Sequence, residues 1–141
     1  MAHAQGTRDW RMRTLSWADL DRAVDTTLER FQSSPWTGVY GIPRGGLVLA
    51  VCLSHRLGLP LLDQPEAGCL VVDDIYETGR TLEPFRSRKD ITTLVWISKV
   101  EPQWWSALEV NDSSEWVLFP WENAAAARAD EQQYRASRSH G

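Results

Sequence analysis

The stretch GCLVVDDIYETGRTL, from Gly68 to Leu82, decides the fold of this chain. Its first part, Cys69 to Val72, is an apolar run without alternation, which is typical of a parallel strand buried on both faces. Two adjacent carboxylates, Asp73 and Asp74, follow where this strand should reach the carboxyl edge of its sheet. Open α/β folds bind ligands at that edge, so the sequence predicts a binding site there.

The residues after the carboxylates, Glu77 to Thr81, form a turn with two threonine hydroxyls and a glycine able to adopt positive φ. We expect a short helix to follow, from Leu82 to Arg88. Because free backbone N–H groups and the dipole of a helix start attract anions, this turn is typical of a phosphate-binding loop. The acidic pair alone is ambiguous, since such carboxylates also suit a metal site or remain solvated at a strand end.

The segments around this stretch alternate between strand and helix patterns. Ser16 to Asp19 fits a capping box, and an apolar stripe at helical spacing extends to Phe31. Pro43-Arg44-Gly45-Gly46 connects a predicted strand, Thr37 to Ile42, to a helix that Gly58 should end. This turn lacks the residues of a Walker loop and of a dinucleotide fingerprint. The other predicted elements are strands over Leu59 to Leu62 and Ile91 to Ile97, and a helix from Ala124 to about Tyr134.

Size and composition indicate one domain and do not exclude a small anionic ligand. At 141 residues and a net charge of −4, the chain has no basic surface to suit nucleic acid or an anionic membrane. Cys52 and Cys69 lie in apolar runs and are expected to be reduced core residues, which fits a cytoplasmic location. No segment has the pattern of a secretory signal or a transmembrane helix. We expect a single domain over residues 1–141, with a flexible arm over 1–14 and a frayed tail over 135–141.

Three segments of the chain, which follow one another in the order of the family's motifs, resemble the type I phosphoribosyltransferases. VVDDIYETGRTL looks like the signature with which that family binds phosphoribosyl pyrophosphate (PRPP). GVYGIPRGG resembles the pyrophosphate-binding loop of the purine enzymes, in which the peptide that here joins Pro43 to Arg44 is often cis. WVLFPWE, from Trp116 to Glu122, resembles the hood of xanthine/guanine phosphoribosyltransferases. The resemblance implies a mainly parallel sheet flanked by helices, with a small C-terminal hood and a shortened flexible loop.

The resemblance implies a reaction in which PRPP and a 6-oxopurine, such as guanine, xanthine or hypoxanthine, give a nucleotide and pyrophosphate. Asp73 and Asp74 would contact the ribose hydroxyls and hold Mg²⁺, a hard cation that prefers carboxylate oxygens. The implied catalytic residues are Glu77, one methylene longer than the usual aspartate, as acid/base near N7, and Lys99 as the donor to O6.

The implied binding residues fall into two groups. Those for PRPP are Arg44, Gly45, Gly46, Asp73, Asp74, Glu77, Thr78, Gly79, Arg80 and Thr81. Those for the base are Lys99, Trp116, Val117 and Glu122, with the ring of Trp116 stacked on the purine. Arg80 stands where several relatives have glycine, and we expect it to point to solvent. The expected partners are PRPP, a purine base and other copies of the chain in a dimer or larger homo-oligomer, without nucleic acid or membrane.

One segment departs from the family pattern. Relatives of the xanthine/guanine type have a long mobile loop that closes over PRPP, whereas only Asp63 to Gly68 is available here. The short loop supports one alternative, a PRPP- or nucleotide-binding regulator with little turnover. Glu77, in place of the usual aspartate, supports another, a phosphoribosyltransferase for another acceptor. The pair Trp104-Trp105 fits a surface patch, a subunit contact or a core element.

Overall fold

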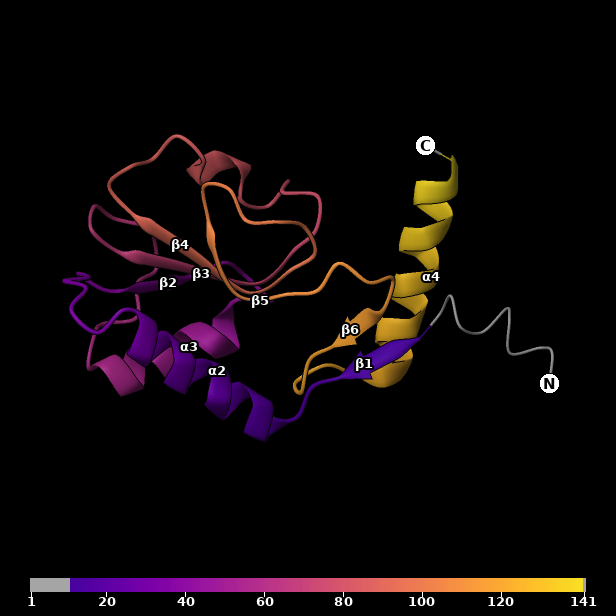
Figure 1. The fold of residues 1–141 in the computed structure, drawn as a ribbon, viewed down its shortest axis with the longest axis horizontal. Helices are drawn as coiled ribbons and strands as arrows, with labels where there is room; N and C mark the ends of the chain where they lie inside the picture. The colour runs from indigo at the N-terminus through magenta and orange to yellow at the C-terminus, as the bar shows by residue number, and fades with distance from the viewer. Residues whose placement is uncertain (1–10, 141) are drawn as a thin grey trace. The chain divides into compact units, whose positions relative to one another are not determined.

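The computed structural model of the chain describes residues 11–140, which form two compact units (Figure 1). One unit comprises the chain up to Leu20 together with the chain from Ser113, and the other runs from Asp21 to Asp112. The expected single domain stays a prediction. No helix in the described range is long and apolar enough to cross a membrane.

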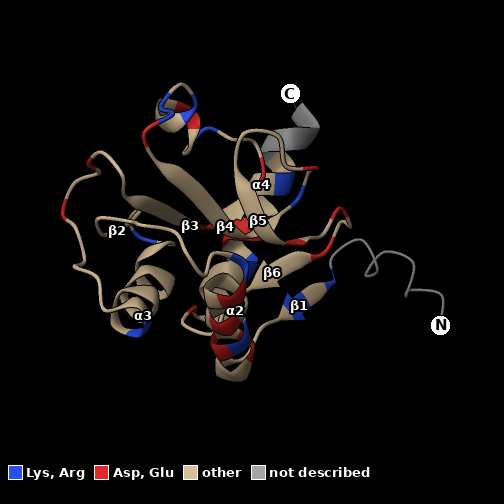
Figure 2. Cartoon of the chain, turned by 60° about the vertical axis from the view of Figure 1, so that its left-hand side comes forward, with Lys and Arg blue, Asp and Glu red and all other residues tan. Residues whose placement is uncertain are grey.

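The unit from Asp21 to Asp112 is built on a four-stranded parallel sheet with the order β2-β3-β4-β5 (Figure 1). Its strands are β2 Val39–Gly41, β3 Leu70–Tyr76, β4 Thr92–Ser98 and β5 Ser106–Val110. Helix α3, Leu47–Leu57, packs against β2 and β3, and α2, Trp17–Arg30, lies on the same side of the sheet (Figure 2). The predicted fold class, a parallel sheet flanked by helices, is confirmed.

The two helices begin and end where the sequence predicts. The backbone N–H of Ser16 donates to Asp19 at 2.8 Å, and that of Asp19 donates to the Ser16 hydroxyl at 3.1 Å, which completes the capping box of α2. Acidic and basic residues are mixed along this helix (Figure 2). Helix α3 ends at Gly58, which adopts the left-handed conformation with φ of 69°.

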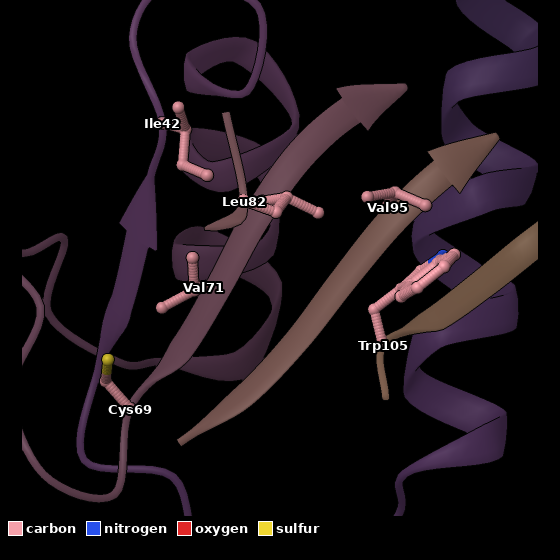
Figure 3. Close-up of a cluster of buried hydrophobic side chains, with 6 residues drawn as sticks. All are labelled: Ile42, Cys69, Val71, Leu82, Val95 and Trp105. Atoms are coloured by element: carbon pink, nitrogen blue, oxygen red, sulfur yellow. The ribbon is translucent and has the colours of Figure 1, made fainter. Parts of the chain in front are cut away.

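The core of this unit lies around the central strand β3. Leu70, Val71 and Val72 are all fully buried, so the strand is covered on both faces, as its unbroken apolar run predicts. Figure 3 shows one cluster of this core, in which Val71 lies near Leu82, and Trp105 lies at the start of β5 near Val95. Trp105 is only 5% exposed, so it is a core residue.

Two predicted elements are much shorter in the structure. The strand expected over Leu59 to Leu62 is a single bridge between Val39 and Leu61, because Pro60 has no N–H for a ladder and Leu61 is exposed. The helix expected over Leu82 to Arg88 is wrong: only a 3₁₀ turn forms, Glu83–Phe85. So short a segment makes a stable helix only if it buries an apolar face, and here only Leu82 is fully buried.

The other unit pairs the two distant parts of the chain. Strand β1, Met12–Thr14, runs parallel to β6, Trp116–Leu118, and α4, Ala124–His140, packs on β6. The expected flexible arm therefore includes a strand at Met12–Thr14, while its residues 1–10 lie outside the described residues. Helix α4 also continues through most of the expected frayed tail.

Candidate functional site

The turn Pro43–Gly46 lies against the carboxyl-terminal half of β3. Strand β2 ends opposite Val72, and the N–H of Ile42 then donates to the Val72 carbonyl at 2.9 Å. A Cβ on Gly46 would lie 3.0 Å from Cα of Asp73 and would overlap the Val72 carbonyl oxygen, so only glycine fits there. The peptide bond between Pro43 and Arg44 is cis, as the resemblance implied.

The same turn reaches the second carboxylate of β3. A Cβ on Gly45 would lie 2.6 Å from Cγ of Asp74 and would overlap its oxygens. Since β2 and β3 are parallel neighbours, the turn after β2 and the loop after β3, Glu77 to Thr81, lie side by side at one edge of the sheet. The two segments that were predicted to bind anions therefore share one edge of the sheet.

Asp73 and Asp74 form an acidic pair without a basic partner. Asp73 is 5% exposed and Asp74 is half-buried, and no basic side chain in the described part of the chain forms an ion pair with either. One oxygen of Asp73 accepts from the N–H of Asp74 at 2.9 Å, and one of Asp74 accepts from Ile75 at 2.8 Å. When the pair is ionised, no basic side chain of the described residues neutralises its charge.

The surroundings of the pair raise both pKa values. Burial raises the pKa of Asp73 above its usual value, although hydrogen bonds with Asp74 oppose the shift. Burial, followed by the charge of Asp73, raises the pKa of Asp74 to about 8. A bound cation would reverse this penalty, because it stabilises the ionised forms of both carboxylates.

The donor set fits Mg²⁺ better than a metal that needs a full protein cage. The described residues contain no group of three or more His, Cys, Asp or Glu that could hold a metal. Mg²⁺ binds through one or two carboxylates and takes its other ligands from water and substrate phosphates. Asp73 and Asp74 supply two such carboxylates at the edge of the sheet where the phosphate loop begins.

The phosphate loop, defined as Glu77 to Thr81, offers donors rather than a helix start. Thr78, Arg80 and Thr81 are exposed, whereas Gly79 is buried and has φ of 83°. The Thr78 hydroxyl accepts from the N–H of Arg80 at 3.4 Å. Among the described residues, none accepts a hydrogen bond from the N–H of Thr78, Gly79 or Thr81. Because no α-helix follows, the loop can bind an anion through these N–H groups and hydroxyls, without a helix dipole.

Lys99 lies at the same edge of the sheet, directly after β4. Its N–H donates to the carbonyl of Tyr76 at 2.8 Å, which ties it to the end of β3. Its half-buried side chain places Nζ 3.5 Å from Oδ1 of Asn111. An amine at this place can donate to a ligand bound over β3 and β4.

The predicted hood residues belong to the other unit. Trp116 begins β6, is half-buried and lies 5.6 Å from the ring of Tyr134, measured between centroids. Val117 is buried. Glu122 is exposed, and its carboxylate accepts from the N–H of Phe119 at 2.9 Å. The structure thus brings the predicted PRPP residues and Lys99 together at one edge of one sheet, and the roles of all these residues and of the hood residues stay predictions.

Two residues that sequence reasoning did not assign also contact this region. The ring of Tyr76 lies beneath Gly79 and stacks on Trp105, with centroids 3.7 Å apart. For Tyr76, the signal in the sequence was an aromatic residue directly before the loop. An aromatic side chain at a strand end is normally interpreted as part of the core. Asn111, next to Lys99, carried no signal at all.

Among known proteins, this chain is similar in sequence to xanthine-guanine phosphoribosyltransferases. No protein-family model matches the chain. A xanthine-guanine phosphoribosyltransferase from Cereibacter sphaeroides is 28% identical over 118 residues, which cover 63% of this chain and 71% of that protein. Another from Idiomarina loihiensis is 26% identical over 141 residues, covering 77% of this chain and 85% of that protein.

Solved structures that are similar to this chain are phosphoribosyltransferases as well. A purine phosphoribosyltransferase from Pyrococcus horikoshii matches with a TM-score of 0.64 and 27% identity, over 82% of this chain and 95% of that one. A xanthine-guanine-hypoxanthine phosphoribosyltransferase from Helicobacter pylori has the same fold, with a TM-score of 0.64 and 19% identity over 82% of this chain and 97% of that one. These similarities confirm the resemblance to type I phosphoribosyltransferases, including the xanthine-guanine enzymes, and show that the chain has their fold.

Proposed function

We propose that the chain is a Mg²⁺-dependent purine phosphoribosyltransferase, which transfers the 5-phosphoribosyl group of PRPP to a 6-oxopurine such as guanine, xanthine or hypoxanthine. The observation that carries the proposal is the arrangement at the carboxyl edge of the sheet. There the Pro43–Gly46 turn, the acidic pair and the phosphate loop follow neighbouring parallel strands. The relatives with purine phosphoribosyltransferase names support the same reading.

PRPP carries charge at two ends, and the site offers a separate partner for each. The phosphate loop would bind the 5′-phosphate through the N–H groups of Thr78, Gly79 and Thr81, which have no acceptor among the described residues. The turn with Arg44 and Gly45 would bind the pyrophosphate, and Gly46 allows the turn to lie close to β3.

The acidic pair lies between these two partners in the chain. Asp73 and Asp74 would accept hydrogen bonds from the ribose hydroxyls and would hold the metal. When bound, Mg²⁺ would neutralise charge on the pyrophosphate as it leaves. The C1–oxygen bond to pyrophosphate breaks, a bond from C1 to N9 of the purine forms, and the N9 proton is lost. The protein therefore has to hold charge in place rather than supply a nucleophile.

The base would be held by Lys99 and by the hood. Lys99 would donate to O6 and stabilise negative charge on the purine as N9 loses its proton. Adenine has an amino group at that position, and two facing donors leave a buried polar group unpaired, which costs about 1 to 3 kcal/mol. Glu77 would act as acid/base near N7, Trp116 would stack on the purine, and the backbone around Val117 and Glu122 would meet its 2-substituent.

We further propose that the protein works in the cytoplasm as a dimer or larger homo-oligomer. Both cysteines are unpaired, which suits a reducing compartment. A second candidate function is a PRPP- or nucleotide-binding regulator with little turnover. The short segment Asp63 to Gly68 favours it, because this segment is too small to cover the site.

The test is a panel of acceptors. Guanine, xanthine, hypoxanthine, adenine, orotate and uracil are each offered with PRPP and Mg²⁺, and pyrophosphate release is followed. Release with 6-oxopurines but not with adenine supports the proposal. Release only with orotate or uracil would assign another acceptor. PRPP binding without release for any base would favour the regulator.

A further inference from the structure

The phosphate loop lacks the support that a following helix would give. It leads into the 3₁₀ turn Glu83–Phe85, so no helix fixes the directions of its N–H groups. Thr78, Arg80 and Thr81 are exposed, and Gly79 alone in the middle of the loop is buried. Gly79 is therefore a position at which a packed side chain can hold the loop in one conformation.

The side chain of Tyr76 occupies the space beneath Gly79. A Cβ on Gly79 would lie 2.7 Å from Cζ of Tyr76 and would overlap its hydroxyl. The Tyr76 ring in turn stacks on Trp105, with centroids 3.7 Å apart and an angle of 12° between the planes. The loop thus lies on an aromatic pair, which we call the aromatic brace, consisting of Tyr76 and Trp105.

The brace is fixed to the end of β4. Trp105 is 5% exposed, and its indole N–H donates to the hydroxyl of the fully buried Ser98 at 3.2 Å. That hydroxyl donates to the carbonyl of Val100 at 2.5 Å. Lys99, which lies between Ser98 and Val100 in the chain, donates its backbone N–H to the Tyr76 carbonyl at 2.8 Å. The brace therefore connects the phosphate loop with the segment that carries the proposed contact to the base.

We propose that Tyr76 and Trp105 are positioning residues, which hold the phosphate loop in the conformation that binds the 5′-phosphate. Tyr76 replaces the support of the missing helix by packing beneath Gly79, and Trp105 holds the Tyr76 ring in place. This inference rests on the proposed function for the identity of the ligand. Because neither side chain contacts the reacting atoms in this scheme, loosening the brace weakens PRPP binding and changes the rate of saturated enzyme much less.

Three variants test the brace, and one matched control tests for general destabilisation. Tyr76→Leu removes the stack, Trp105→Phe removes the hydrogen bond to Ser98, and Tyr76→Phe keeps the stacked ring. The control is Trp36→Phe. Trp36 is 8% exposed, and its indole N–H donates at 3.1 Å to the hydroxyl of Thr92, the first residue of β4. The control thus loses the same kind of bond at the opposite end of the same strand.

The first readout is the KM for PRPP against kcat at saturating base. Tyr76→Leu and Trp105→Phe are expected to raise this KM by roughly two- to tenfold, the range that an aromatic pair and a net hydrogen bond, respectively, contribute. Tyr76→Phe should retain most of the affinity, and Trp36→Phe should leave the KM unchanged. If all variants change KM equally, or change only kcat, the positioning role is wrong.

The second readout does not depend on turnover. Under native conditions, the rate of tryptic cleavage after the exposed Arg80 is measured by mass spectrometry for each variant. Tyr76→Leu and Trp105→Phe should accelerate this cleavage relative to wild type and to Trp36→Phe. Unchanged cleavage would overturn the inference even if the protein transfers phosphoribosyl groups. Faster cleavage in a protein that binds no PRPP would support the brace while the proposed function fails.

Discussion

Gly45 lies so close to Asp74 that a Cβ on the glycine would come within 2.6 Å of the carboxylate carbon. Gly45 belongs to the Pro43–Gly46 turn after β2, whereas Asp74 lies within strand β3. Their contact fixes the pyrophosphate turn relative to the acidic pair. It also means that the smallest possible side chain at position 45 must displace either the turn or the carboxylate.

Gly45→Ala is therefore expected to weaken PRPP binding by about tenfold or more, since a change of that size follows from losing roughly 1.4 kcal/mol of contacts. Isothermal titration with PRPP and Mg²⁺ measures it. The matched control is Gly58→Ala, because Gly58 ends α3 and a Cβ there meets nothing within 4 Å, although its φ of 69° makes alanine mildly strained. Equal loss of affinity in both variants would contradict the role of this contact.

The raised pKa of Asp74 predicts how stability depends on pH. In the folded protein this pKa is about 8, above the ordinary value of 3.8, so the folded state binds a proton that the unfolded state has lost. The associated stability is complete below pH 4 and is lost as the pH rises towards 8. Without Mg²⁺, the melting temperature of the wild type should fall between pH 5 and 8, and Asp74→Asn should flatten the curve and raise the melting temperature at pH 8.

A carboxylate with the opposite shift provides the control for this pH dependence. The hydrogen bond from Arg88 lowers the pKa of Asp90, so the stability that Asp90 contributes is lost only in acid. Asp90→Asn should therefore leave the slope between pH 5 and 8 unchanged. A wild-type melting temperature that is constant over this range would mean that the acidic pair is not buried in solution as the structure has it.

Stability and binding should move in opposite directions at the acidic pair. The double variant Asp73→Asn with Asp74→Asn removes the buried charge, so its melting temperature at pH 8 should rise. It should also lose PRPP affinity, together with the dependence of that affinity on Mg²⁺, because amides neutralise no cation. Loss of binding in a more stable protein cannot be misfolding. Unchanged PRPP affinity would remove these carboxylates from the site.

The sequence predicted strand β3 and the start of helix α2 well, because the signals for both are local. The unbroken apolar run before Asp73 needs burial on both faces, and the capping box at Ser16 needs only residues one turn away. The predicted helix after Leu82 and the full strand at Leu59 to Leu62 did not form, because a local signal is not enough for such short elements. Whether Leu82 continues into a helix, or Leu61 into a strand, depends on how much surface the neighbouring elements bury, which no local pattern records.

The aromatic brace shows what the sequence leaves out at a site. Tyr76 and Trp105 are far apart in the chain, and no local pattern links them. Only tertiary packing places Tyr76 beneath Gly79 and stacks it on Trp105. The same applies to position 45, where the close approach to Asp74 of strand β3 explains why the residue is glycine. Motif order therefore predicts which residues gather at the edge of the sheet, and the structure shows what holds them there.

Contacts to the base should be separable from contacts to PRPP. Lys99→Ala is expected to raise the KM for the purine by roughly ten- to a hundredfold, since a hydrogen bond from a charged group contributes about 1.5 to 3 kcal/mol. Trp116→Ala should raise it by roughly fivefold, as loss of stacking of about 1 kcal/mol implies. Both should change the KM for PRPP little. Lys89→Ala, at an exposed position before β4, is the control, and equal effects on the two substrates would indicate misfolding instead.

The last prediction concerns the short segment Asp63 to Gly68. It joins the bridge at Leu61 to the start of β3, and its hydrogen bonds hold it at the amino end of the sheet. The N–H of Gly68 donates to the Asp90 carbonyl at 2.6 Å, and the N–H of Thr37 donates to the Gly68 carbonyl at 3.0 Å. Both partners precede a strand, whereas the proposed site lies at the carboxyl ends. This segment therefore cannot cover PRPP, and Trp105, buried in the core, cannot cover it either.

An electron-poor C1 that is open to water can be captured by water while the leaving group departs, and loop closure is the usual protection. We therefore expect slow transfer together with some release of pyrophosphate in the absence of a base, unless a second copy of the chain covers the site. The measurement compares pyrophosphate release with and without saturating purine, and light scattering gives the oligomeric state of the same sample. Fast release that depends strictly on the base, from a protein shown to be monomeric, would contradict the conclusion drawn from the short segment.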